Sequence, residues 1–230
     1  MSDKNTSNSK KSAYIAIEGN IGAGKTSLCK QLSKDWSASL LLENFDENPF
    51  LPRFYENPKE HALAVELFFM TERHEQMNAW LLKRQTEGST DYHIADYIFS
   101  KTLLFAKRNL NNEEWTLFER LFAALNAHIP QPDLLVYLHR PVEELLKNIK
   151  VRNRSYEQKI EAAYLEGIEA AYYELFNRLE CSTNKTPVLI LDVTGADFVH
   201  NPKDYEVVKN YIQRSYPIGL HKRQALAAKY

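Results

Sequence analysis

A glycine-rich segment behind a short apolar run carries the residue types that hold phosphate. The segment GNIGAGKTS, from Gly19 to Ser27, satisfies the pattern G-x-x-x-x-G-K-[ST]. In such a loop the backbone amides point toward an anion, Lys25 approaches the β- and γ-phosphates of a nucleotide, and the Thr26 hydroxyl holds Mg²⁺. The alternative is an ordinary glycine turn between a strand and a helix. The predicted ATP-binding loop consists of Gly19, Asn20, Ile21, Gly22, Ala23, Gly24, Lys25, Thr26 and Ser27.

A carboxylate stands where the acceptor of that phosphate is expected to bind. Glu43 lies near the carboxyl end of the apolar run at residues 39–45, and ligands of open parallel sheets bind at this edge. With a hydroxyl within reach, Glu43 accepts its proton as the phosphoryl group arrives. The alternative is a solvated acid at a strand end. The segment TNKT at 183–186 is not the guanine-reading motif of a GTPase, so a small-molecule kinase is the working hypothesis.

A long segment of helical periodicity at residues 59–84 places polar side chains among apolar ones. Glu66, Phe69 and Arg73 follow one another at i, i+3 and i+7 and share one stripe. A carboxylate inside the run AVELFFM is costly to bury unless it is paired. We therefore considered two interpretations, a buried ion pair between Glu66 and Arg73, and a polar contact to a bound ligand.

Apolar runs without polar alternation are separated by helical patterns, as expected for strands buried on both faces of a parallel sheet. This arrangement predicts an α/β doubly wound fold. Asn112 and the pair Asn201-Pro202 are predicted helix starts. The predicted strands are 14–18, 39–45, 92–96, 134–139 and 187–193, and the predicted helices are 25–36, 59–84, 101–109, 113–127, 141–151, 157–180 and 202–213.

Composition bounds the class of protein. The 230 residues are enough for one domain, predicted at 13–213, between a disordered tail at 1–12 and a second tail at 214–230. A formal charge of −1 gives no general basic field for nucleic acid or a membrane surface. Cys29 and Cys181 lack metal-ligand spacing, and no run approaches the ~20 apolar residues of a membrane span. We expect a soluble cytoplasmic protein.

Several segments together resemble the deoxynucleoside kinase family, over about residues 13–212. They are IEGNIGAGKTSL at the loop, LLENFDENPFLPRFYENP after the second strand, ELFFMTER in the long helix, EEWTLFERL, VRNRSYEQ ahead of AAYLEGI, and LILDVTGADF. The resemblance implies a P-loop kinase fold with a five-stranded parallel sheet, helices on both faces and an arginine-bearing lid. It also implies ATP-dependent phosphorylation of the 5′-hydroxyl of a deoxynucleoside, with Mg²⁺, in nucleotide salvage.

The resemblance also implies residue roles. Glu43 matches the acid that acts on the 5′-hydroxyl, while Tyr55 and Glu157 match a pair on the 3′-hydroxyl. Glu66 stands where family members commonly carry glutamine, and an ionised glutamate only accepts hydrogen bonds. This substitution favours bases that present amino groups over thymine, and we expect a purine preference. The predicted substrate-binding residues are Glu43, Tyr55, Glu66, Phe69, Arg73, Asp96, Lys101 and Glu157.

The lid and the donor site complete the expectations from the resemblance. Arg152 and Arg154 match lid arginines that clamp the phosphates, whereas Asp197 and Phe198 lie in a loop similar to the one that contacts the donor adenine. The predicted catalytic residues are Glu43, Lys25 and Arg152, and the predicted metal ligands are Thr26 and Asp96. The family's helices matching EWTLFERLFAALNAHI and EQKIEAAYLEGIEAAYYELF form homodimers, so we expect a homodimer.

The chain departs from the family pattern after the third strand. The usual acid-arginine pair is Asp96-Tyr97 here, and Asn148 replaces another common arginine. Lys101 or Arg73 is the hypothetical source of the missing charge. The alternatives to a nucleoside kinase are a nucleoside monophosphate kinase and a non-catalytic nucleotide-binding switch. The acids Glu43, Asp46 and Glu47 oppose the former, because they would repel the acceptor's phosphate.

Overall fold

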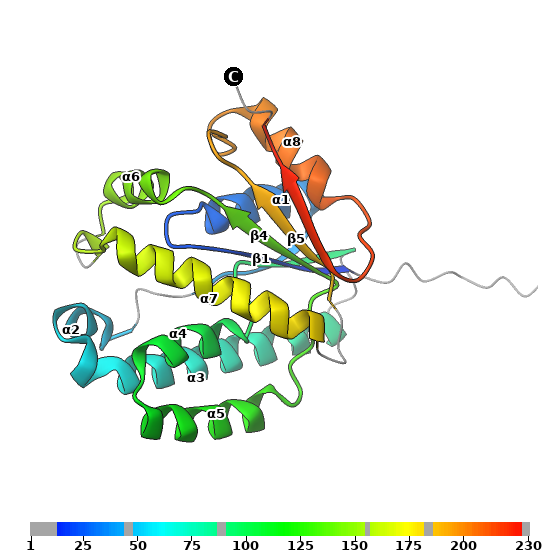
Figure 1. The fold of residues 1–230 in the computed structure, drawn as a ribbon. Helices are drawn as coiled ribbons and strands as arrows, with labels where there is room; N and C mark the ends of the chain where they lie inside the picture. Colours follow the sequence, from blue (N-terminus) through cyan, green and yellow to red (C-terminus); the bar gives the residue numbers. More distant parts are fainter. Residues whose placement is uncertain (1–12, 44–47, 87–90, 155–156, 182–185, 227–230) are drawn as a thin grey trace, which may run out of the picture.

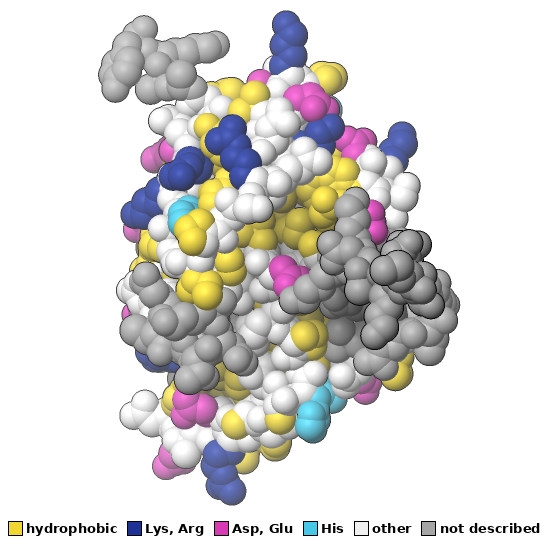
Figure 2. Space-filling view, turned by 90° about the vertical axis from the view of Figure 1, so that its right-hand side faces the viewer, with side chains coloured by type: hydrophobic (Ala, Val, Ile, Leu, Met, Phe, Trp, Pro, Cys, Tyr) yellow, Lys and Arg dark blue, Asp and Glu magenta, His cyan; other side chains and the backbone are white. Residues whose placement is uncertain are grey.

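A computed structural model describes residues 13–43, 48–86, 91–154, 157–181 and 186–226 of the chain. The predicted tail at 1–12, the end of the predicted strand 39–45 and the last four residues lie outside these ranges. No helix in the described part has the length and apolar character that crossing a bilayer requires. Basic and acidic side chains are interspersed on the face shown in Figure 2, in keeping with the nearly balanced charge.

Six parallel strands form one sheet in the order β2-β3-β1-β4-β5-β6. The phosphate loop follows the central strand β1, and Glu43 follows β2, two positions away across β3. Both therefore lie at the carboxyl edge of the sheet, as expected for a doubly wound fold. The strands are β1 (Ala13–Gly19), β2 (Ser39–Leu41), β3 (Tyr92–Ala95), β4 (Leu134–His139), β5 (Val188–Asp192) and β6 (Leu220–Gln224).

Helices cover both faces of the sheet (Figure 1). One face carries α1 (Lys25–Trp36), α6 (Val142–Arg152) and α8 (Pro202–Ile212). The other carries α3 (Pro58–Thr86), α4 (Lys101–Asn109), α5 (Asn112–Asn126) and α7 (Ala162–Cys181), with α2 (Leu51–Glu56) against α3. The prediction of helices on both faces of a parallel sheet is confirmed.

Alternation along the central strand divides the apolar core into two halves. Tyr14 and Ala16 pack among residues of α3, α4, α5 and α7, whereas Ile15 and Ile17 pack against α1, α6 and α8. Successive strand side chains point to opposite faces, so a strand buried on both sides is apolar at nearly every position. This requirement explains the unbroken apolar run that ends at the phosphate loop.

The sheet has six strands rather than the predicted five, because β6 lies within the segment 214–230 that we expected to be a tail. Its sequence LHKRQ has no apolar run, since an edge strand paired on one side needs little burial. The helix α2, which begins with Leu51 and Pro52, was also not predicted from the sequence. Its six residues are too few to show a helical periodicity of apolar positions.

Several predicted boundaries differ from the structure by a few residues. Helix α5 is capped by Asn111 rather than Asn112, because the Asn111 side chain accepts from Glu114 N while the Glu114 carboxylate accepts from Asn111 N. Asn201 caps α8 as predicted, accepting from Lys203 N. Strand β2 ends at Leu41, and α7 begins at Ala162 rather than 157.

One buried carboxylate ties the phosphate-loop strand to the segment after β3 and to helix α7. Glu18, at the end of β1, is fully buried and accepts from Ile98 N at 2.9 Å and from the Tyr172 hydroxyl of α7 at 2.7 Å. Burial raises the pKa of Glu18, although Lys101 and Lys25 oppose the shift. The position of Gly19, and so of the loop, depends on these hydrogen bonds.

Replacing Tyr172 by phenylalanine should therefore destabilise the fold by about 1–3 kcal/mol, because a buried oxygen of Glu18 loses its donor. Urea unfolding measures the change. Tyr173→Phe is the matched control, since Tyr173 is the next residue of α7 and is only partly buried. Equal losses of stability in the two variants would contradict a specific role for the Tyr172 hydroxyl.

Candidate active site

A cavity of about 810 Å³ opens at the carboxyl edge of the sheet. It extends from the phosphate loop to the first half of α3 and is also lined by Arg152, Arg154 and Glu157, which we call its roof. The structure brings most of the predicted site residues to it. Those lining the cavity are Gly19, Ile21, Gly22, Ala23, Gly24, Lys25, Thr26, Ser27, Tyr55, Glu66, Phe69, Arg73, Lys101, Arg152, Arg154, Glu157, Asp197 and Phe198.

The phosphate loop has the backbone that its glycines predict. Gly24 caps α1 with φ of 95°, a conformation that favours glycine, and a Cβ there would lie 2.8 Å from Phe198 Cζ. The Lys25 ammonium donates to the carbonyls of Gly19 at 2.8 Å and Asn20 at 3.0 Å. Burial, together with the Lys101 ammonium, lowers the pKa of Lys25 to about 8. The loop thus holds a desolvated cation inside its curve.

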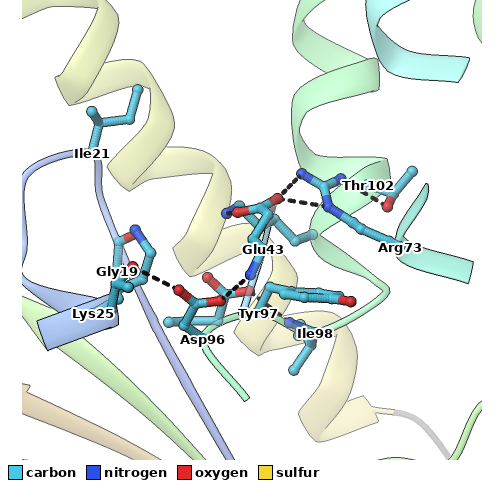
Figure 3. A network of polar contacts seen from close by, with 12 residues as sticks. Gly19, Ile21, Lys25, Glu43, Arg73, Asp96, Tyr97, Ile98 and Thr102 are labelled. Carbon is cyan, nitrogen blue, oxygen red and sulfur yellow. Dashed lines mark hydrogen bonds and ion pairs between the residues drawn. The ribbon is translucent and has the colours of Figure 1, made fainter. Parts of the chain in front are cut away.

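Two cations from different helices pair with Glu43, and Figure 3 shows the contact with Arg73. Arg73 of α3 donates through Nε at 2.8 Å and Nη2 at 2.5 Å to Oε1, and Lys101 of α4 donates to Oε2 at 2.6 Å. The second Arg73 amine also donates to the Thr102 hydroxyl at 2.9 Å, which fixes the guanidinium plane. All three charged side chains are nearly inaccessible, at 2% exposure for Glu43 and 4% for each partner.

This arrangement determines the charge of Glu43. Burial alone raises the pKa of its carboxyl, but Lys101 and Arg73 outweigh burial and lower that pKa to about 2. Glu43 is therefore an ionised, acceptor-only group. It does not line the cavity itself and lies below Arg73 and Lys101, which do.

Asp96 connects Glu43 to the phosphate loop. Its Oδ1 accepts from Glu43 N at 2.7 Å, and its Oδ2 accepts from the Thr26 hydroxyl at 2.7 Å. Burial and the Glu43 charge raise the pKa of Asp96. Two hard oxygen ligands thus meet beside the loop, and Mg²⁺ is commonly held by one or two carboxylates together with nucleotide phosphates. In the described ranges no three His, Cys, Asp or Glu side chains could hold a metal by themselves.

The contacts of the α3 stripe exclude one of its two interpretations. Arg73 pairs with Glu43, and Glu66 Oε1 instead accepts from the Asn109 amide of α4 at 2.7 Å. The buried Glu66–Arg73 ion pair is therefore wrong. The Arg73 guanidinium lies 5.1 Å from the centre of the Phe69 ring, which forms an apolar wall of the cavity.

Both predicted lid arginines contact the same acid. Arg152 donates to Glu157 Oε2 at 3.1 Å from Nε and 2.5 Å from Nη2, and Arg154 lies 3.5 Å from Glu157 Oε1. Glu157 is buried, whereas the Arg152 side chain is 38% exposed. The residues predicted to hold phosphate and sugar are thus adjacent to one another at the cavity roof.

Three predicted site residues do not line the cavity. Glu43 and Asp96 are buried and contact the lining residues Lys101 and Thr26. The Asn20 side chain donates to Leu165 O and accepts from Ile21 N. Asp46 and Glu47, the other two acids expected to repel the phosphate of a monophosphate acceptor, lie outside the described residues.

The structure adds cavity residues that the sequence argument missed. Arg140 follows β4 directly, donates to Ala196 O at 2.9 Å and lies 5.6 Å from the Phe198 ring centre. Lys147 of α6 also lines the phosphate end. Arg140 could have been identified from its position directly after a strand, because ligands bind at the carboxyl edge of the sheet, the reasoning that identified Glu43. Asn109 and Tyr164 line the opposite end and gave no local signal.

Tyr97, which stands in place of the family arginine, is fully buried. Its hydroxyl donates to Gln76 at 3.0 Å, so it faces α3 rather than the phosphate loop. The proposed substitutes Lys101 and Arg73 both contact Glu43. Asn148 donates to Gly22 O at 2.8 Å and thereby braces the loop. The other lysine and arginine side chains that line the cavity are Lys25, Arg140, Lys147, Arg152 and Arg154.

The chain is similar in sequence and in fold to known proteins of one family. A sequence model of the family described as deoxynucleoside kinase matches residues 15–216. The chain is 32% identical to a deoxyguanosine kinase of Bacillus subtilis, covering 87% of this chain and 96% of that protein. It is 30% identical to a deoxyguanosine kinase of Lactobacillus johnsonii, covering 86% and 90%. A solved deoxyadenosine kinase from M. mycoides with bound dCTP superposes with a TM-score of 0.71 at 20% identity, covering 86% and 98%.

Because the pKa of Glu43 is lower in the folded protein than in the unfolded chain, the stability of the fold should depend on pH. Its pKa is depressed from 4.5 to about 2, so its contribution is complete above about pH 5 and is lost as the pH falls toward 2. Glu43→Gln should cost about 3–5 kcal/mol near neutral pH, because two buried cations lose their partner. The cost should shrink markedly at about pH 3, where the wild-type protein also loses part of this contribution.

Denaturant unfolding of both proteins at the two pH values measures this difference. Glu119→Gln is the control, since Glu119 is exposed in the middle of α5 and should cost little at either pH. A cost of Glu43→Gln that stays constant between the two pH values would mean that Arg73 and Lys101 do not hold this carboxylate ionised.

Proposed function

This chain belongs to the deoxynucleoside kinase family, and we propose that it transfers the γ-phosphoryl group of ATP to the 5′-hydroxyl of purine deoxynucleosides in nucleotide salvage. One observation carries the proposal most directly. A single cavity joins the phosphate loop, with Lys25, to a pocket walled by Phe69 and holding the buried acid Glu66. That pocket offers the apolar surface and a polar anchor for recognition of a base.

Glu43 is the proposed base beneath the junction of the two halves. Its Oε1 accepts two hydrogen bonds from Arg73 and its Oε2 one from Lys101, which leaves lone-pair capacity on Oε2 for an incoming hydroxyl. A pKa near 2 makes Glu43 a weak base. A loose phosphoryl-transfer transition state asks mainly for positioning and charge stabilisation, so an ionised acceptor that orients the hydroxyl suits the reaction.

The phosphates are proposed to lie in the loop, under the arginines of the roof. Lys25 and the loop amides meet the β- and γ-phosphates, and Arg152 and Arg154 offset the charge that develops during transfer. In the structure Glu157 holds both arginines, so nucleotide binding has to compete with that acid for them. Asp197 and Phe198 line the donor end beside Gly24.

Mg²⁺ is the proposed metal, held by the Thr26 hydroxyl and by Asp96 directly or through water. Their 2.7 Å hydrogen bond places both oxygens at the loop. When bound together with a nucleotide, Mg²⁺ neutralises phosphate charge. Asp96 in addition fixes the Glu43 backbone, so the same side chain orients the acid beneath the acceptor.

The sugar and base contacts follow from the remaining cavity residues. Tyr55 and Glu157 are proposed to bind the 3′-hydroxyl, and Glu66 to accept a hydrogen bond from the base. A purine acceptor is supported by the names of the related deoxyguanosine and deoxyadenosine kinases and by Glu66, which in its ionised form offers no donor to the carbonyls of thymine.

The protein is proposed to act as a homodimer. Helix α5 exposes Leu117 at 48% and Leu121 at 40%, one turn apart on the same side of the helix. An exposed apolar stripe of this kind is what a helical contact between two copies would cover.

A phosphoryl-transfer assay with ATP and a panel of acceptors tests the proposal. Deoxyadenosine and deoxyguanosine should gain a 5′-phosphate much faster than thymidine, and Glu43→Gln should lower the rate by roughly 10²–10⁴-fold. Phosphorylation of deoxynucleoside monophosphates instead would support the monophosphate kinase alternative. Slow ATP hydrolysis with no phosphorylated acceptor would support a nucleotide-dependent switch.

Lys101→Ala should lower kcat/KM for the nucleoside by about 10²-fold, because a cation that contacts Glu43 is removed from a site closed to water. Lys107→Ala is the matched control, since Lys107 lies on the same helix with a side chain that is 47% exposed. Steady-state kinetics measure both, and circular dichroism confirms that both variants are folded. Unchanged kcat and KM in Lys101→Ala would remove Lys101 from the reacting centre.

A further inference from the structure

Glu66 presents a buried carboxyl with one engaged and one unpartnered oxygen. The residue lies on α3 with 2% of its surface exposed, and it lines the cavity. Its Oε1 accepts from the Asn109 amide at 2.7 Å. Its Oε2 is buried and has no hydrogen-bond partner within the described ranges. A buried polar atom without a partner is costly, so an unpartnered carboxylate oxygen on a residue that lines a binding cavity points to a ligand.

Charged and titratable groups reach this carboxyl from each element around it. Arg73 on α3 and Lys101 on α4 are engaged by Glu43, which itself adds a negative charge nearby. Tyr164 on α7 is close enough for Glu66 to raise the tyrosine pKa, and Tyr55 on α2 lines the same cavity.

The balance of these groups leaves Glu66 able to lose or keep its proton near neutrality. Burial is the largest effect and raises the pKa of Glu66 to about 7, whereas the Asn109 amide and the Arg73 cation oppose it. Arg73 and Lys101 lower the pKa of Glu66 only in part, because Glu43 already neutralises much of their charge. Both protonation states are therefore accessible under ordinary conditions.

Asn109 determines which oxygen carries the proton. Because an amide NH₂ is a donor, Oε1 must act as an acceptor, and the proton of the neutral acid then resides on Oε2. The ionised group presents two acceptors to the cavity. The neutral group presents one donor at Oε2 and one acceptor at Oε1.

These two patterns match two purines. The Watson–Crick edge of guanine presents two adjacent donors, N1–H and the 2-amino group, whereas that of adenine presents one donor, the 6-amino group, next to the acceptor N1. We propose that Glu66 selects between them by its protonation state, binding guanine as the carboxylate and adenine as the carboxylic acid. This inference rests on the proposed function and names the group that sets its base specificity.

The direction of the pH dependence follows from this assignment. Below the midpoint the neutral form predominates and favours adenine, and above it the carboxylate favours guanine. The ratio of ionised to neutral acid changes about tenfold per pH unit, which sets the upper limit for the change in selectivity. Effects of pH on the reacting centre act on both substrates and cancel in their ratio.

The test is the ratio of kcat/KM for deoxyguanosine to that for deoxyadenosine, measured from about pH 6 to 8. The ratio should rise by at least about tenfold over this range in the wild-type protein. In Glu66→Gln, which cannot ionise, it should be independent of pH. Glu75→Gln, the same substitution at an exposed position of α3, should keep the wild-type slope. A flat wild-type ratio, or an equal slope in Glu66→Gln, would overturn the inference.

A second measurement needs no variant. Calorimetric titrations at neutral pH in buffers of different ionisation enthalpy should show proton uptake when deoxyadenosine binds and proton release when deoxyguanosine binds. Identical proton exchange for the two nucleosides would contradict the inference while leaving the kinase activity intact. Failure to phosphorylate any deoxynucleoside would instead overturn the proposed function, and this inference with it.

Discussion

The organisation of the site depends on one buried negative charge that cannot remain without partners. Burying a carboxylate without compensation costs several kcal/mol, and Glu43 avoids this cost through Arg73 and Lys101, while its backbone N–H is held by Asp96. These contacts join α3, α4 and the ends of β2 and β3. The same bonds that keep Glu43 ionised therefore fix the distance between the phosphate loop and the base pocket.

The cavity has two ends with opposite electrostatic character. At the loop, Lys25, Arg140 and the roof arginines place positive charge where phosphates are proposed to bind. At the other end Glu66 has little charge compensation, because Glu43 engages the nearby cations. Because Arg73 and Lys101 pair with Glu43, they compensate little of the charge on Glu66. Burial therefore raises the pKa of Glu66 to about 7.

Much of the architecture could be predicted from the sequence because its signals are local. The phosphate loop, the helices at 25–36 and 101–109 and the strand at 134–139 agree with the structure, since periodicity and loop chemistry are set by neighbouring residues. Strand β6 and helix α2 could not be predicted, because an exposed edge strand and a short helix need no apolar pattern of their own.

The sequence by itself determined which groups are present: a phosphate loop, an acid after the second strand, and an acid and an arginine on one helix. Only the tertiary structure decided their partners. Glu66 and Arg73 are two turns apart on α3, roughly 10 Å along its axis, and each instead meets a side chain from another element. Arg73 and Lys101 lie 30 and 58 positions from Glu43 in the chain. Pairing over such separations is fixed by the packing of helices on the sheet, because no local pattern specifies which distant charge will be buried alongside.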